Sequence, residues 1–198
     1  MILKSNEYFK HFTSLPGPLI KTLDDINKKL PEIGKHRILS KGKGKYQTSF
    51  KILKRYHLKS KYPHNFAARS CYNVLSIGST QPGKVTPMFA DIWRELIKIY
   101  PDHFISSSNT LLYEPKDYMG WHTNSNMATL RLYINHVNED NKSFFRYVDP
   151  ITKENITSFD VKGWQARVFN ISKEKPLWHC VYAETSRISL GFRIVKKK

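Results

Sequence analysis

The sequence predicts an α+β protein whose helices come first and whose strands follow. Two observations predict this class. Before residue 101 the apolar residues recur at helical spacing in two segments, and from about residue 104 onward they follow the spacing of strands. The length of 198 residues fits one domain, or one domain with an appendage, and suffices to bury a core without disulfide bonds.

Two amphipathic helices are expected in the first half. The first has Pro18 in its first turn, carries apolar residues at helical spacing through Leu30, and ends at Pro31. The second follows Pro87 and ends at Pro101. We expect its apolar stripe to pack against the core and not to form a cofactor site; the stripe consists of Phe89, Ile92, Trp93, Leu96, Ile97 and Tyr100.

Seven short strands are expected in the second half, where segments rich in β-branched and aromatic residues are separated by turn residues. These segments are 110–114, 130–137, 143–149, 154–161, 164–171, 177–183 and 187–195. Seven strands at this spacing favour a sandwich, a jelly roll or a barrel. We expect residues 105–198 to form this unit and residues 1–104 to form a helical, basic region that packs on it within one structural domain.

Composition narrows the class of protein. No apolar run approaches the roughly 18 residues needed to span a bilayer, and residues 1–7 lack the apolar segment of a secretory signal. A cytoplasmic location is therefore expected, or the host cytoplasm if the protein is viral. Cys71 and Cys180 are too few for a disulfide framework and match neither a redox motif nor a zinc cluster, so both are expected to be buried thiols.

The chain is strongly basic, with a net charge of +17 and a pI near 9.8. Residues 1–72 hold sixteen Lys and Arg against four Asp and Glu, and residues 35–61 hold ten basic residues with no acidic one. Residues 41–45 resemble a flexible basic loop. One interpretation is a face that binds polyanions, most simply nucleic acid or a ribonucleoprotein, and the other is a solvated basic surface. The candidate polyanion-binding residues are Lys41, Lys43, Lys45, Lys51, Lys54 and Arg55, with the nearby aromatic residues Tyr46, Phe50, Tyr56 and Tyr62 available to stack on bases.

The strand-rich half carries the candidate chemistry. His122 follows a strand and a glycine-containing turn, and His179 lies in a strand 57 residues later. Arg187 and Ser189 open the last expected strand, which continues to Arg193. Two histidines with one carboxylate form the facial triad of non-haem iron sites, and an arginine fork binds a carboxylate in a bidentate manner. The residues therefore indicate an iron site with an anion anchor.

With these residues, the sequence resembles the Fe(II)/2-oxoglutarate-dependent oxygenases. That family has the pattern His-x-Asp/Glu, a second His, and then Arg-x-Ser, which matches His122-x-Asn124, His179 and Arg187-x-Ser189 over roughly residues 105–195. The resemblance implies a double-stranded β-helix, a jelly-roll and cupin-like core, here with flanking N-terminal helices. It also implies Fe(II) and 2-oxoglutarate as cofactors.

Two branches of the family resemble the chain in further residues. AlkB-type demethylases end in an Arg-x5-Arg strand, like Arg187 to Arg193, and have a tyrosine nine residues before the first histidine, like Tyr113. Aspartyl/asparaginyl β-hydroxylases have a cofactor-binding arginine nine residues after the first histidine, like Arg131, and lack the carboxylate ligand. The resemblance therefore implies that Tyr113, Arg131 and Arg193 join Arg187 and Ser189 as cosubstrate contacts.

Asn124 departs from the family pattern because an amide replaces the anionic ligand. The segments 120–126 and 147–150 resemble phage-encoded members of the family with unassigned substrates, so the chain is similar to a phage-type member with HxN in place of HxD. Three accounts are open: Asn124 ligates weakly, the site works with two histidines, or the iron site has decayed. Asp117 and Asp149 are possible substitute carboxylates.

Two functional hypotheses follow from the resemblance. The first is an oxygenase that hydroxylates a macromolecule, either a protein side chain or a nucleic-acid base, and releases succinate and CO₂; residues 1–104 would shape its entrance. Its partner would be nucleic acid or a protein associated with nucleic acid. The second is a catalytically degenerate β-helix that serves as a nucleic-acid- or protein-binding module.

Overall fold

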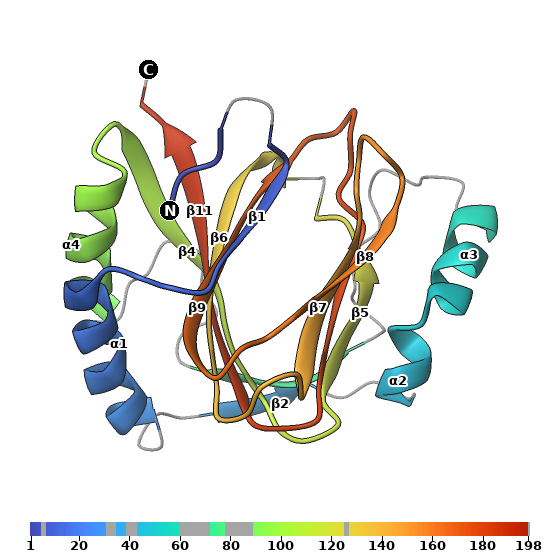
Figure 1. Cartoon of the computed structure of the whole chain (residues 1–198), viewed down its shortest axis with the longest axis horizontal. Coiled ribbons are helices and arrows are strands. Elements are labelled where there is room, and N and C mark those ends of the chain that lie inside the picture. Colours follow the sequence, from blue (N-terminus) through green and yellow to red (C-terminus); the bar gives the residue numbers. More distant parts are fainter. Residues whose placement is uncertain are drawn as a thin grey trace.

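A computed structural model describes residues 1–4, 7–30, 35–38, 43–59, 72–77, 89–124 and 127–197 (Figure 1). Its helices are α1 (Gly17–Lys29), α2 (Gly44–Gln47), α3 (Phe50–Lys59) and α4 (Ala90–Ile99). Its strands are β1 (Phe9–Phe12), β2 (Lys35–Ile38), β3 (Tyr72–Ile77), β4 (His103–Tyr113), β5 (Tyr118–His122), β6 (Thr129–Val137), β7 (Ser143–Val148), β8 (Asn155–Phe159), β9 (Gly163–Ile171), β10 (His179–Ala183) and β11 (Arg187–Lys196). The predicted α+β class is confirmed.

The strands β4 to β11 form a jelly roll. Four of them pair antiparallel in the order β9-β6-β11-β4, called here the major sheet, and the other four pair in the order β5-β10-β7-β8, called the minor sheet. Consecutive strands alternate between the two sheets except at the β7–β8 hairpin, and this order is that of the expected double-stranded β-helix. Strand β3 pairs with both β4 and β5, so it joins the two sheets, while β1 extends the major sheet beyond β9.

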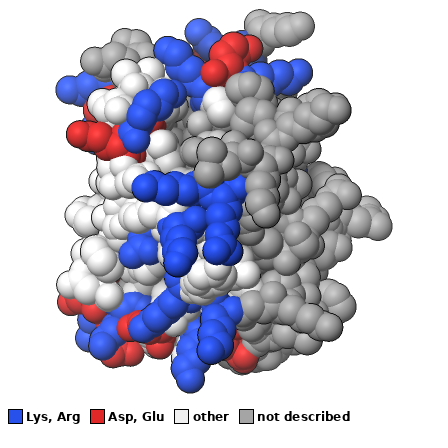
Figure 2. Space-filling model, turned by 90° about the vertical axis from the view of Figure 1, so that its right-hand side faces the viewer, with Lys and Arg blue, Asp and Glu red and all other residues white. Residues whose placement is uncertain are grey.

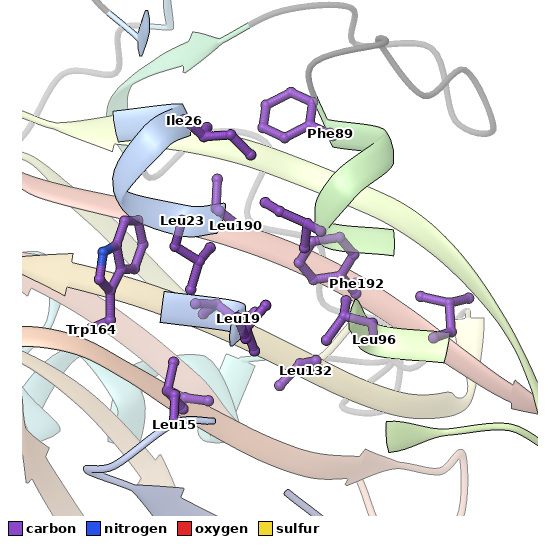
Figure 3. Close-up of a cluster of buried hydrophobic side chains, with 14 of the residues drawn as sticks. Leu15, Leu19, Leu23, Ile26, Phe89, Leu96, Leu132, Trp164, Leu190 and Phe192 are labelled. Atoms are coloured by element: carbon purple, nitrogen blue, oxygen red, sulfur yellow. The ribbon is translucent and has the colours of Figure 1, made fainter. Parts of the chain in front are cut away.

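Helices α1 and α4 cover the outer face of the major sheet (Figure 1). Leu19, Leu23 and Ile26 of α1 are buried, as the helical spacing predicts. They pack with Ile92 and Leu96 of α4 against outward-facing residues of β6, β9 and β11 (Figure 3). The Nε1 of Trp164 donates to Asp24 at 2.8 Å and ties α1 to β9.

Buried apolar residues also cover both faces of the minor sheet. The space between the sheets is filled by residues such as Phe145, Tyr147 and Phe169. On the outer face, Ile52 and Leu53 of α3 pack with residues of the minor sheet and its connections, namely Trp121, Trp178 and Cys180. A Cβ at Gly44 would lie 2.8 Å from the ring of Tyr182 and 2.9 Å from that of Tyr118, so only glycine lets α2 approach these rings so closely.

Several boundaries differ from the expectations. Strand β5 was not expected, because Gly120 suggested a turn; Gly120 instead lies within β5, which ends at His122. Strand β4 begins at His103, and β1, β2 and β3 were also not expected. Gly44 and Lys45 lie in α2, so this end of the expected flexible loop is helical, while Lys41 and Cys71 lie outside the described residues. In the part of the chain that the structure describes, no helix is long and apolar enough to cross a membrane.

Strand β1 also closes the seam between the major and minor sheets. His11 donates from Nε2 to Gln165 Oε1 at 2.7 Å, and its Nδ1 accepts from Ser158 Oγ of β8 at 3.1 Å. Phe9 stacks on Tyr147 of β7 with ring centroids 4.1 Å apart. The edge of the major sheet is therefore joined to β8 and β7 through side chains.

The His11 contact predicts a loss of stability in acid. Burial, and then the charge of Arg167, lower the pKa of His11 to about 4. Since the unfolded ring titrates near pH 6.5, the stabilisation by the neutral ring is complete above that pH and is lost as the pH falls toward 4. For this partly exposed ring we expect a loss of about 1–2 kcal/mol in the free energy of unfolding.

The measurement is urea unfolding at several pH values between 7 and 4 for the wild type and for His11→Gln. The variant should lose less stability over this range, because the glutamine cannot take up a proton. An equal loss in both proteins would show that His11 does not contribute to the acid sensitivity.

Candidate metal centre

His122 and His179 meet between the two sheets. They are register partners on the neighbouring strands β5 and β10, and their ring centroids are 4.0 Å apart. The Nδ1 of His122 bonds to the carbonyl of Gly120 at 2.8 Å, and the Nδ1 of His179 bonds to the carbonyl of Leu177 at 2.8 Å. A carbonyl can only accept, so both Nδ1 atoms carry the proton and both Nε2 atoms present a lone pair.

Both histidines are neutral at physiological pH. Only 2% of His122 and none of His179 is exposed. Burial lowers the pKa of His122 to about 4, and burial together with the neighbouring His122 lowers the pKa of His179 well below its usual value. Phe145 stacks on His179 at 5.2 Å between centroids, which limits access of water. A neutral, fixed pair of imidazoles is the form in which histidine binds a metal ion.

Asn124 lies beside this pair. Its Nδ2 is 3.5 Å from Nε2 of His179, and its backbone has φ 54°, in the left-handed region that asparagine tolerates. Rotation of the amide by 180° would place Oδ1 at the same position. The possible substitute carboxylates are engaged elsewhere: Asp117 accepts the N–H of Glu114, and Asp149 accepts two N–H groups in its own turn. Within the described ranges, no group of three or more His, Cys, Asp or Glu could hold a metal ion.

Arg187 lies at the start of β11 and is 1% exposed. Its Nε donates to Asp160 Oδ2 at 2.8 Å, whereas its Nη1 and Nη2 are buried and have no hydrogen-bond partner in the described part of the chain. Asp160 also accepts from Arg167 Nη1 and from Ser143 Oγ. Despite its burial, these two arginines hold the pKa of Asp160 far below its usual value. The aspartate therefore fixes Arg187 through Nε and leaves the two Nη groups available.

The inner face of the major sheet carries further polar groups near Arg187. Register places Ser189 opposite Asn135 and Arg193 opposite Arg131, with Gly191 between them. The guanidinium of Arg187 lies 5.2 Å from the ring of Tyr113. Four buried polar atoms in this region have no partner among the described residues: Arg131 Nε, Arg193 Nε, Asn135 Oδ1 and Ser108 Oγ.

This region has an excess of buried positive charge. Arg131, Arg167 and Arg187 are each at most 2% exposed, and Asp160 is the carboxylate that contacts two of them. Burial lowers the pKa of Arg131, and the charge of Arg131 in turn contributes to the low pKa values of both histidines. Unpaired buried cations are costly, so the arrangement suits a ligand with two negative charges. The arginine N–H groups fit a dicarboxylate, and the two unprotonated Nε2 atoms fit a divalent metal ion.

The structure thus brings the candidate histidines together and places Tyr113, Arg131, Arg187, Ser189 and Arg193 on strands of the major sheet. Sequence reasoning missed Asp160, Arg167 and Asn135. A signal for Arg167 was present, because it is a charged residue flanked by the apolar residues Ala166 and Val168 in the middle of an expected strand. The basic candidates lie elsewhere. The exposed residues Lys43, Lys45, Lys51, Lys54 and Arg55 are on or next to α2 and α3, and these helices lie on the outer side of the minor sheet (Figure 1).

Comparison with known proteins gives a likeness in structure. No protein-family model and no curated protein sequence matches the chain. A prolyl-4-hydroxylase of Pseudomonas putida is similar with a TM-score of 0.52 and 12% identity, over 97% of this chain and 95% of that one. An oxidoreductase of the 2OG-Fe(II) oxygenase family from Burkholderia pseudomallei is similar with a TM-score of 0.58 and 12% identity, over 94% of this chain and 84% of that one. At this identity the likeness shows the fold: the chain has the double-stranded β-helix of the 2-oxoglutarate oxygenases.

Proposed function

We propose that the chain is an Fe(II)/2-oxoglutarate-dependent dioxygenase that hydroxylates a macromolecular substrate. One observation supports this above the rest. A neutral histidine pair with both Nε2 atoms unprotonated lies in the same barrel as an excess of buried arginine N–H groups. A metal ion and a dianionic cosubstrate would satisfy both sets of groups at once.

Each residue of the site has a proposed role. His122 and His179 would hold the metal ion through Nε2, with Asn124 Oδ1 as a weak third ligand. Arg187 would bind the far carboxylate of 2-oxoglutarate through Nη1 and Nη2, and Ser189 would assist it.

The remaining residues would complete the binding of the cosubstrate. Arg131 and Arg193 would offset negative charge of the bound cosubstrate on the side toward the histidines. The ring of Tyr113 would pack beside Arg187. The apolar residues between the sheets would exclude water. When bound, iron and 2-oxoglutarate supply the oxidising chemistry, with succinate and CO₂ as co-products. Residues 1–104 would shape the entrance for the substrate.

The test is an anaerobic titration with Fe(II) and 2-oxoglutarate, followed by measurement of succinate when O₂ is admitted. The wild type should bind both and turn over, His122→Ala should lose the metal, and Arg187→Ala should lose the cosubstrate. Arg94→Ala is the matched control, because this exposed arginine on α4 pairs with Asp91 of the same helix. Absence of metal-dependent cosubstrate binding in the wild type would refute the proposal.

Asn124 favours one alternative function, a catalytically degenerate β-helix that acts as a nucleic-acid- or protein-binding module. An amide oxygen can coordinate, but it neutralises none of the charge of the metal ion. Tight cosubstrate binding without succinate formation would support this alternative over the oxygenase.

Replacement of Asn124 by Asp is expected to tighten Fe(II) binding at least about tenfold, because it adds an anionic oxygen beside the two imidazoles. The left-handed backbone at this position tolerates aspartate as well as asparagine. The measurement is the dissociation constant for Fe(II) under anaerobic conditions. Asn170→Asp on the exposed side of β9 is the control with the same charge change. Unchanged affinity in Asn124→Asp would place Asn124 outside the ligand set.

A further inference from the structure

A trough lies on the outer face of the minor sheet, away from the histidine pair. It consists of two adjoining pockets of about 660 Å³ and about 260 Å³, which share Lys45, Tyr182 and Glu184 in their walls. Helix α2 forms one side of it, and β5, β7, β8 and β10 with their connections form the other. None of the residues proposed above for the metal or the cosubstrate lines this trough, which we call the α2 trough.

The α2 trough is lined by cations. Glu184 is the acidic residue among the lining residues, and it pairs with Lys45 at 2.6 Å in an exposed ion pair. The cations are Lys43, Lys45, Lys116, Lys142 and Arg146, and the neighbouring helix α3 adds the exposed Lys51, Lys54 and Arg55. Figure 2 shows that Lys and Arg side chains gather in a band along the middle of this face. Such a band suits a ligand with several negative charges in a row.

Aromatic rings lie between these cations. Tyr118 and Tyr182 line the larger pocket, and Phe144, Phe159 and Tyr182 line the smaller one. Tyr118 and Tyr182 are buried and form the floor of the pockets, whereas Phe159 is 46% exposed, which leaves its ring accessible for stacking.

Arg146 is fixed among these rings. Its guanidinium lies 4.1 Å from the ring of Phe144, and it donates to Thr157 Oγ1 at 2.9 Å and to the carbonyl of Thr48 at 3.1 Å. A basic groove with interspersed rings is the arrangement by which proteins bind single-stranded nucleic acid.

We infer that the α2 trough binds single-stranded nucleic acid, with phosphates on the lysines and an unpaired base on the exposed ring of Phe159. A nucleotide fits a pocket of this size. Double-stranded nucleic acid fits less well, because its bases are stacked on one another and cannot reach rings set in a pocket.

The location of the trough connects it with the site. Trp121 and Trp178 pack under α3 on the outer side of the minor sheet, and the next residue in each case is a histidine of the inner pair. A nucleic-acid strand bound along α2 and α3 would therefore lie on the outer side of the chain segments that carry His122 and His179. If the bound nucleic acid is the substrate of the site, the inference rests on the proposed function. The binding of nucleic acid in the α2 trough does not depend on it.

The experiment measures fluorescence anisotropy of labelled oligo-dT and oligo-U of about 12 nucleotides, and of a duplex of equal length, at several salt concentrations. At least one single strand should bind more tightly than the duplex. Joint replacement of Lys45, Lys116 and Lys142 by Ala should weaken binding at least about tenfold. It should also lower the number of counterions released on binding by about two, which makes the affinity less dependent on salt. Phe159→Ala should weaken binding about fivefold or more.

The matched control is joint replacement of Lys21, Lys28 and Lys29 by Ala, which removes the same charge from α1 on the opposite side of the molecule (Figure 1). Equal losses of affinity in the two triple variants would show that binding depends on net charge and not on the α2 trough, which would overturn the inference. Duplex binding as tight as single-strand binding would overturn it as well.

The His122→Ala variant separates this inference from the proposed function. It should retain the binding of the oligonucleotide whether or not the wild type turns over 2-oxoglutarate. A wild type that turns over 2-oxoglutarate but binds none of the oligonucleotides would refute nucleic-acid binding by the α2 trough. The oxygenase proposal would not be affected.

Discussion

Arg187→Lys is expected to weaken the binding of 2-oxoglutarate by about 30- to 100-fold although it preserves the positive charge. In the wild type, Nε is held by Asp160 and the two Nη groups are buried and unpaired. A lysine has a single ammonium group, which would pair with Asp160 and leave nothing equivalent to the two Nη donors. The measurement is calorimetric titration of the Fe(II)-loaded protein without O₂.

Two results would separate this account from general damage. Metal affinity should be unchanged in Arg187→Lys, because the histidines are not altered. Arg94→Lys, in an exposed helical ion pair, should bind 2-oxoglutarate as the wild type does. If Arg187→Lys also binds it as tightly as the wild type, the cosubstrate does not use Arg187.

Asp160→Asn is expected to lower the free energy of unfolding by about 3–5 kcal/mol, because it removes one partner from a buried ionic cluster. Asp160, Arg167 and Arg187 are essentially fully buried, so the variant would leave two cations without an anion. The measurement is urea unfolding at pH 7, with the exposed Asp102→Asn as the control.

The dependence on pH gives a second check on Asp160. Since the native pKa of Asp160 lies below its unfolded value, the stabilisation is complete above about pH 4 and is lost as the pH falls further. The difference between the wild type and Asp160→Asn should therefore narrow below that pH. A variant as stable as the wild type at pH 7 would show that the cluster contributes no net stability.

The sequence predicted the strands that carry strong patterns. In β6, β9 and β11 the residues are rich in β-branched and aromatic types, and turn residues mark the ends. The short strand β5 was missed because Gly120 and Met119 are not strand formers; pairing with β10 and burial of Trp121 impose the strand there. Helices α2 and α3 were missed because the segment was interpreted as a flexible basic loop followed by basic and aromatic residues available to bind polyanions.

The candidate site could be predicted only in part. The two histidines and Arg187 were found by spacing along the chain, and the structure places the histidines side by side. Asp160 could not be assigned, because its role depends on contacts with Arg167 and Arg187 across strands, and no local pattern encodes such contacts. The α2 trough likewise arises only when residues from helix α2 and the minor sheet come together.

The two long edges of the jelly roll are closed by different means. On one side β3 pairs with both β4 and β5, so a continuous ladder of backbone hydrogen bonds runs from one sheet to the other. On the other side, β1 and β8 meet through side chains such as His11 and Ser158. Separating β3 from β4 or β5 requires the loss of backbone hydrogen bonds between strands. Separating β1 from β8 requires only a local rearrangement of side chains. We therefore expect the contact between β1 and β8 to open at a lower cost in free energy than the pairings of β3 with β4 and β5.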